Sequence, residues 1–189
     1  MEKVILNNLQ LDHLAWTHPC LAGVFHGTVP CDRLPRVVPR EGPTAYIVNT
    51  DPHDKPGMHW LALWTHGNVC EIMDSYAIPL DSYGTAEPMK DWMGRHYKYQ
   101  VHNDRSLQSI FSQSCGAYAL MFLIDRAEGR SMNEFLNRFK ARDFVWNDHH
   151  VGLMLRRLIV NEKDWGKVCE KPCHQDTQGS LSGVHHLLH

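Results

Sequence analysis

The spacing of apolar and polar positions divides the chain into a strand-rich first half and a helical second half. Apolar positions from Lys3 to Trp16 fit a short amphipathic helix. Prolines are then dense up to Pro43, which favours irregular chain or an edge strand over 23–43 and indicates a connector, not a core element. Strand-like segments follow at 45–49, 58–65 and 69–73. The second of them is apolar on both faces, as expected of a central strand covered on both sides.

Helical patterns dominate the rest of the chain. Residues 85–97 predict a helix with Pro88 in its first turn. The segment that opens at Cys115 is apolar on all sides in its middle, so it predicts a helix buried in the core, with Gly129 as its stop signal. Amphipathic helices are predicted over 132–144 and 151–160.

This order of elements predicts an α+β fold, because strands come first and helices lie on both sides of them in the sequence. A small, mainly antiparallel sheet would pack against the buried central helix that starts at Cys115. The length of 189 residues, with 43% hydrophobic residues, suits one core. We expect a single domain over 1–171 and a flexible, polar, glycine-rich tail over 172–189.

Composition narrows the class of protein. The 19 Lys and Arg residues against 21 Asp and Glu residues give a net charge of −2, which provides no large positive field for a polyanion. Six scattered cysteines do not form a dense disulfide framework and favour a reducing compartment, with cytoplasm or nucleus the default location. The N-terminus carries charges at Glu2 and Lys3 and no long apolar run, so we expect neither a signal peptide nor a membrane span.

Three residues fit the machinery of a thiol nucleophile, which needs a base, a group that orients the base, and donors for the oxyanion. Cys115 stands at the start of an apolar helix, where free N–H groups and the positive end of the helix dipole favour a thiolate. His59 lies on the predicted central strand and Asp74 ends the next one, so antiparallel pairing brings imidazole and carboxylate together. We expect the carboxylate to accept the Nδ1 proton, which leaves Nε2 facing the thiol.

Gln108 is the candidate side-chain donor of the oxyanion hole. It lies seven residues before Cys115, near enough for its amide N–H to converge with the Cys115 main-chain N–H on one oxygen. Gln113 is a competitor closer to the thiol. Gly116 leaves room for a substrate backbone beside the nucleophile.

Several motifs in one order carry a family resemblance. The strings FHGTVPCDRLPRVV, AYIVNT, GMHWLALW, CEIMD and LQSIFSQSCGAYALMFL resemble the adenoviral endopeptidase (adenain) family, and less closely the ubiquitin-like-protein-specific peptidases that share its fold. The resemblance spans residues 25–125. It implies a cysteine peptidase in which His59, Asp74, Gln108 and Cys115 have the roles given above, with Trp60 lining the substrate cleft.

The chain departs from the adenoviral pattern in three ways. Adenoviral enzymes have Glu where this chain has Asp74, whereas the ubiquitin-like-specific relatives use Asp. Well-studied adenoviral enzymes are strongly basic and use DNA, and they bind an activating peptide through a thiol upstream of the oxyanion-hole Gln. Residues 90–107 contain no cysteine and the net charge is −2, so the sequence supports neither partner. We expect no cofactor.

Other clusters have simpler interpretations. Cys169 and Cys173, with the nearby histidines His174, His185 and His186, lack the second well-spaced pair of a zinc site, so we expect no metal. His53, His66 and His96 fall in turns or on an exposed helix and are interpreted as solvated histidines.

Three functions remain open at this point. The resemblance favours an endopeptidase that cleaves viral capsid or core precursors at small-residue, Gly-type sites, acting in the host nucleus or cytoplasm or in the virion. The alternative is a deconjugating peptidase for a ubiquitin-like modifier, which Asp74 favours. A catalytically inactive binding module on the same fold is the third, although packing alone does not require these four residue types together.

Overall fold

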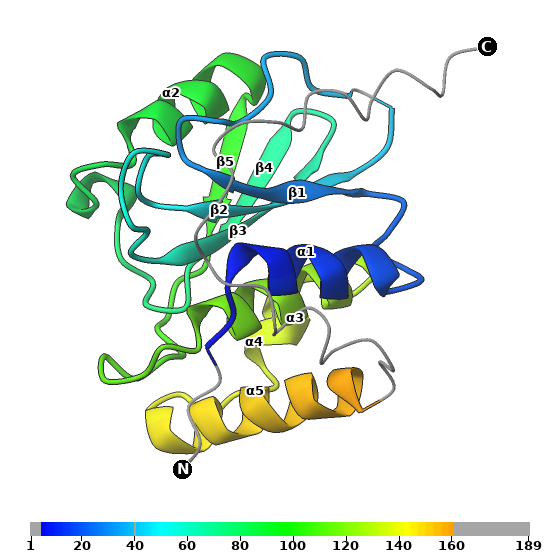
Figure 1. The fold of residues 1–189 in the computed structure, drawn as a ribbon, viewed down its shortest axis with the longest axis vertical. Coiled ribbons are helices and arrows are strands. Elements are labelled where there is room, and N and C mark those ends of the chain that lie inside the picture. The colour runs from blue at the N-terminus through cyan, green and yellow to red at the C-terminus, as the bar shows by residue number, and fades with distance from the viewer. Residues whose placement is uncertain (1–4, 40, 161–189) are drawn as a thin grey trace.

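A five-stranded sheet with helices on both faces forms the body of the computed structural model (Figure 1), which describes residues 5–39 and 41–160. The strands are β1 (Phe25–Pro30), β2 (Thr44–Asn49), β3 (Trp60–His66), β4 (Val69–Met73) and β5 (Tyr99–His102). The α-helices are α1 (Asn8–Thr17), α2 (Glu87–His96), α3 (Cys115–Ala127), α4 (Met132–Leu136) and α5 (Phe144–Ile159). A short 3₁₀ turn, η1, spans Leu80–Ser82.

The strands lie in the order β1-β2-β3-β4-β5, so β3 is the central strand, as its two-sided apolar pattern predicts. The three middle strands pair antiparallel, and the hairpin turn between β3 and β4 contains Gly67, which has a left-handed φ of 57°. The outer strands β1 and β5 add in parallel. The predicted α+β class is therefore confirmed, with an antiparallel centre and a parallel strand at each edge.

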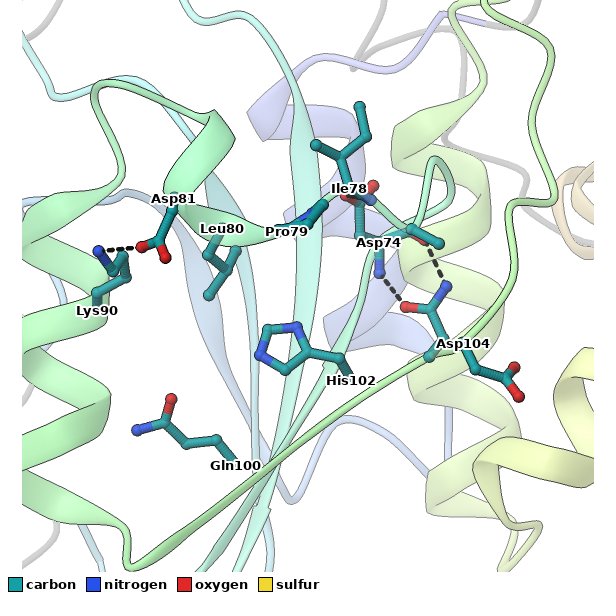
Figure 2. A pocket seen from close by; sticks show the side chains of 11 residues that line it. Asp74, Ile78, Pro79, Leu80, Asp81, Lys90, Gln100, His102 and Asp104 are labelled. Atoms are coloured by element: carbon teal, nitrogen blue, oxygen red, sulfur yellow. Dashed lines mark hydrogen bonds and ion pairs between the residues drawn. The ribbon is translucent and has the colours of Figure 1, made fainter.

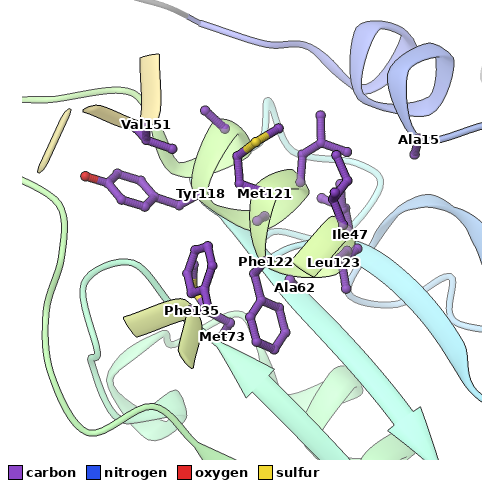
Figure 3. Close-up of a cluster of buried hydrophobic side chains, with 14 of the residues drawn as sticks. Ala15, Ile47, Ala62, Met73, Tyr118, Met121, Phe122, Leu123, Phe135 and Val151 are labelled. Atoms are coloured by element: carbon purple, nitrogen blue, oxygen red, sulfur yellow. The ribbon is translucent and has the colours of Figure 1, made fainter. Parts of the chain in front are cut away.

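Helix α3 is the centre of the larger core. Nearly all of its residues are buried, and its side chains fill the space between the sheet, α1, α4 and α5 (Figure 3). Phe122 and Phe135 meet edge to face with ring centroids 5.5 Å apart. Full burial of such a side chain stabilises the fold by about 1.5–3 kcal/mol. This confirms the prediction of a buried central helix that begins at Cys115.

A second core lies on the other face of the sheet, beneath α2. Trp92 of α2 packs edge to face on Tyr46 of β2, and its indole N–H donates to the Pro35 carbonyl at 2.7 Å. Pro88 stands in the first turn of α2, as predicted. Because both faces of β3 are covered, the site at its end is held from two sides.

Two segments differ from the sequence predictions at the sheet edges. The 23–43 stretch contains edge strand β1, but Phe25, Cys31 and Val38 are buried, so its interpretation as a connector outside the core is wrong. Strand β1 pairs with β2 on one side, and Phe25 packs in the larger core whereas Cys31 and Val38 pack in the second core. Strand β5 was not predicted, because all four of its side chains are exposed and show no alternation.

The C-terminal helices also differ from their predicted bounds. The helix expected over 132–144 ends at Leu136, and the one expected over 151–160 begins at Phe144. Buried Asn147 explains the break: its amide accepts from Lys140 N at 2.8 Å and donates to Lys140 O at 2.9 Å. Asp143 then caps α5 by accepting from Trp146 N. The predicted tail and the Cys169–Cys173 region lie outside the described residues.

Candidate active site

His59 and Asp74 meet at the open end of the β3–β4 hairpin. His59 immediately precedes β3 and Asp74 immediately follows β4, so the hairpin register fixes both backbones. His59 Nε2 lies 2.8 Å from Asp74 Oδ1, and both side chains are almost fully buried. The pairing predicted from the strand pattern is present.

The Asp74 carboxylate is held by a dense set of donors. The main-chain N–H groups of Tyr76 and Ile78 donate to its two oxygens at 2.9 and 3.0 Å, and the Tyr83 hydroxyl donates to Oδ2 at 2.8 Å. Buried carboxylates with several donors are stabilised in the ionised form. Burial opposes ionisation, but the His59 contact and these donors lower the pKa of Asp74.

The main chain at Asp74 is fixed from behind by Asn103. Its side-chain amide accepts from Asp74 N at 2.8 Å and donates to Asp74 O at 2.7 Å. Asp74 also lines a cavity of about 590 Å³ with Lys90 and His102 (Figure 2). Asp74, whose carboxylate pairs with His59, is therefore held through both its side chain and its backbone.

Two tyrosine rings hold the imidazole in its plane. Tyr76 stacks on His59 with centroids 4.7 Å apart, and Tyr83 stacks with centroids 5.6 Å apart. Neither tyrosine was singled out from the sequence. Tyr76 lies only two residues after Asp74, and a tyrosine this close to a predicted catalytic acid was the available signal.

Cys115 lies at the N-terminus of α3, with its thiol close enough to His59 for the imidazole to affect the thiol pKa. Ser114 at the N-cap makes no side-chain capping bond, so the first turn of α3 keeps its donors for other partners. Burial opposes the thiolate, but His59 and the N–H groups of Trp60 and Gly116 outweigh it and lower the pKa of Cys115. The thiol therefore has the surroundings of an activated nucleophile.

The imidazole of His59 is stabilised in its protonated state. Burial opposes its charge, but the hydrogen bond to Asp74 and the neighbouring Cys115 thiol raise the pKa of His59 to about 9. The orientation of the ring differs from the prediction: Nε2, and not Nδ1, faces Asp74, so Nδ1 is the nitrogen left for the thiol. The stacking of Tyr76 and Tyr83 on the ring and the contact of Nε2 with Asp74 Oδ1 hold this orientation.

A cleft of about 620 Å³ runs past these residues. Its walls include Asn49, Met58, Trp60, Tyr76, Gln113 and Cys115. Trp60 thus lines the cleft, as the resemblance implies. Gly116 is buried and lies behind the nucleophile, where an added Cβ would meet Leu11 and Trp60 side chains at 3.4 Å. Its lack of a side chain serves this close packing.

Gln108 lies apart from the cleft surface, with 1% of its surface exposed. Its amide nitrogen donates to the Tyr76 hydroxyl at 3.1 Å and to the Ser112 carbonyl at 3.0 Å, and its oxygen accepts from Ser75 Oγ at 2.6 Å. Both N–H groups are therefore engaged. Gln113, the competitor, is exposed on the cleft wall.

Other charged groups near the site have partners of their own. Glu71 of β4, three residues before Asp74, pairs with Arg126, with Arg126 Nε 2.9 Å from Glu71 Oε2. His53 pairs with Asp32 Oδ2 through Nδ1 at 2.5 Å. Among the described residues there is no group of His, Cys, Asp and Glu suited to a metal ion. No helix there is long and apolar enough to cross a membrane.

Comparisons with known proteins show the fold. No family model and no curated protein matches the chain. A crystal structure of the ASFV pS273R protease aligns over 77% of this chain and 66% of that one, with 14% identity and a TM-score of 0.50. A crystal structure of the selenomethionine form of the same protease aligns over 57% of this chain and 43% of that one, with 18% identity and a TM-score of 0.34. In both alignments the chain spans less than two thirds of the length of that protease. The first likeness shows that the chain adopts the fold of this protease.

Proposed function

We propose that the protein is a cysteine endopeptidase of the adenain type, with Cys115 as nucleophile, His59 as base and Asp74 as the residue that orients the base. The observation that carries the proposal is the buried chain of contacts from Asp74 through His59 to Cys115, with 2.8 Å between Asp74 Oδ1 and His59 Nε2. Structural packing does not require an ion-paired imidazole beside a helix-terminal thiol.

The reaction follows from these groups. The Cys115 thiolate attacks the carbonyl carbon of the scissile bond, and the imidazolium of His59 gives its proton to the leaving amine. Water, deprotonated by His59, then hydrolyses the thioester and restores the thiol. The main-chain N–H of Cys115 and the amide of Gln108 are the proposed oxyanion donors, which requires Gln108 to turn from Ser112 or Tyr76 toward the oxyanion when substrate binds.

The proposed substrates are precursor proteins of a viral capsid or core, cut at small-residue, Gly-type sites in the host nucleus or cytoplasm or in the virion. The fold shared with the ASFV protease and the adenain-like motifs support this choice. The alternative, a peptidase for ubiquitin-like conjugates, is favoured by Asp74 in place of Glu. An activating peptide or DNA is a partner suggested by resemblance alone, and the described residues add no support for either.

The test compares wild type with Cys115→Ala on Gly-containing peptides and on ubiquitin-like conjugates, with cuts mapped by mass spectrometry. We expect wild type to cut the peptides and Cys115→Ala to lose all cleavage while it unfolds at the same temperature. Cys20→Ala, which changes an exposed cysteine in a loop, is the matched control and should cleave like wild type. Cleavage that survives in Cys115→Ala refutes the proposal, and cleavage of conjugates alone favours the alternative.

A further inference from the structure

Asn49 lies next to the proposed catalytic residues, and the proposed mechanism gives it no role. It is the last residue of β2 and pairs in register with Trp60 of β3. The next residue, Thr50, donates its N–H to the His59 carbonyl at 2.9 Å. Asn49 lines the same cleft as Cys115, yet only 6% of its surface is exposed.

The orientation of the Asn49 amide is fixed by its neighbours. Oδ1 accepts from Asp51 N at 2.9 Å and from Met58 N at 3.1 Å. Main-chain N–H groups can only donate, so the atom that faces both of them is the oxygen. The amide nitrogen Nδ2 therefore points elsewhere, and among the described residues it has no hydrogen-bond partner.

Gly57 leaves this nitrogen uncovered. A Cβ on Gly57 would lie 2.9 Å from Asn49 Nδ2, closer than real side chains approach. The left-handed φ of 91° at Gly57 also disfavours any other residue. Gly57 and Asn49 line the cleft together. A donor without a partner among the described residues, carried by a side chain that is otherwise almost buried, lies on the wall of a cleft beside a bare stretch of main chain. Such a donor is suited to an acceptor that arrives with a ligand.

We propose that Asn49 Nδ2 donates a hydrogen bond to a main-chain carbonyl of an extended substrate segment, close to the two residues that the scissile bond joins. The proposal rests on the proposed peptidase function. It makes the substrate at this subsite a peptide recognised through its backbone, independent of the side chain it carries there. Asn49 is then a substrate-binding residue that also holds the 50–58 loop through Oδ1.

The first experiment measures binding in the absence of turnover. Fluorescein-labelled extended peptides that contain Gly are titrated into Cys115→Ala and into Cys115→Ala with Asn49→Asp. Aspartate keeps an acceptor for Asp51 N and Met58 N but removes the donor. We expect the Kd to rise about 3- to 10-fold, the range for one hydrogen bond. Asn68→Asp, in the exposed turn after β3, is the matched control for added charge and should leave the Kd unchanged, at low and high salt.

The second experiment identifies the carbonyl. Each carbonyl upstream of the Gly site is reduced in turn to a methylene, and every peptide is titrated into both proteins. One reduction should weaken binding to the protein that keeps Asn49 and have no further effect on the protein that carries Asn49→Asp. The inference is overturned if every reduction weakens peptide binding to both proteins equally, or if no peptide binds to either protein. Loss of cleavage in wild type with this pattern intact would instead refute the peptidase function alone.

Discussion

The two halves of the proposed site are built differently. The half that activates the nucleophile consists of His59, Asp74 and Cys115, which stand at the ends of β3, β4 and at the start of α3. The half that would receive the oxyanion depends on Gln108, in the loop between β5 and α3, whose donors are already bound to Tyr76 and Ser112. Regular elements thus complete the first half in the free protein, whereas the second must exchange hydrogen bonds when substrate arrives.

The largest effect is expected from the preformed half. Asp74→Asn removes the charge that stabilises the imidazolium, so kcat should fall about 100- to 10,000-fold with little change in peptide binding. Asp74→Glu should keep measurable activity, since the family resemblance includes both residues. Steady-state kinetics on a cleaved peptide measure the kcat of both variants.

Asp91→Asn, on the exposed face of α2, is the matched control for loss of a carboxylate and should behave as wild type. Wild-type turnover in Asp74→Asn would mean that another group orients His59.

The second half predicts a split between two assays. Gln108→Ala should lower kcat about 100- to 1,000-fold, because an oxyanion donor acts in the transition state. Alkylation of Cys115 by iodoacetamide should stay near the wild-type rate, since thiolate formation depends on His59 and α3. The protein should also melt at a lower temperature, because Ser75 loses a buried partner.

Gln113→Ala is the companion variant, and we expect it to retain turnover. If it loses turnover while Gln108→Ala keeps it, Gln113 is the donor. If both retain it, the site has no side-chain oxyanion donor.

The pH dependence of turnover and alkylation tests the first half in another way. Because the pKa of Cys115 is lowered and that of His59 is raised to about 9, the thiolate–imidazolium pair persists between the two values. Iodoacetamide near pH 6 should label Cys115 ahead of Cys31, whose pKa burial raises to about 11. Turnover should fall as pH rises through about 9, where the imidazolium loses the proton for the leaving amine, while alkylation does not fall.

In Asp74→Asn the upper limb of the turnover profile should move to lower pH, because the imidazolium loses its anionic partner. Equal labelling of all cysteines at pH 6 would contradict the activated thiol.

The smallest effect is expected from the Tyr83 hydroxyl, which donates to the Asp74 carboxylate of the first half. Tyr83→Phe removes the hydroxyl that donates to Asp74 but keeps the ring that stacks on His59. Because Tyr76 and Ile78 still donate to the carboxylate, we expect kcat to fall about 3- to 10-fold, the range of a single hydrogen bond. The upper limb of the turnover profile should shift as well, which a purely structural change would not cause.

Tyr99→Phe, on exposed β5, is the control that removes a hydroxyl away from the site. An unshifted pH profile in Tyr83→Phe would show that this hydroxyl does not tune the pair.

The sequence predicts the first half better than the second for a physical reason. His59 and Asp74 flank two apolar strands joined by a short turn, so the hairpin register alone places them side by side. Gln108 lies in a loop whose course depends on bonds from Leu107 N and Gln108 N to the Ser75 carbonyl, far away in sequence. No local pattern encodes such contacts. The ring orientation of His59 and the unpaired nitrogen of Asn49 depend on tertiary placement in the same way.

Edge strand β5 and the break at Asn147 were missed for related reasons. Strand β5 forms because β4 offers a partner, and its four exposed residues carry no periodicity of their own. Asn147 looks like an ordinary polar position in a helical pattern, yet it is fully buried and also donates to the Leu107 carbonyl at 3.1 Å. Long-range hydrogen bonds, and not helix propensity, therefore decide where α4 and α5 are separated.

The placement of Cys115 on α3 has a consequence for the newly made chain. The pKa of the Cys115 thiol is lowered by a histidine 56 positions earlier in the sequence and by the N–H groups of Trp60 and Gly116. A chain still emerging from the ribosome has an ordinary cysteine with the reactivity of any free thiol. Under the proposed function, hydrolytic competence would therefore require closure of the whole core.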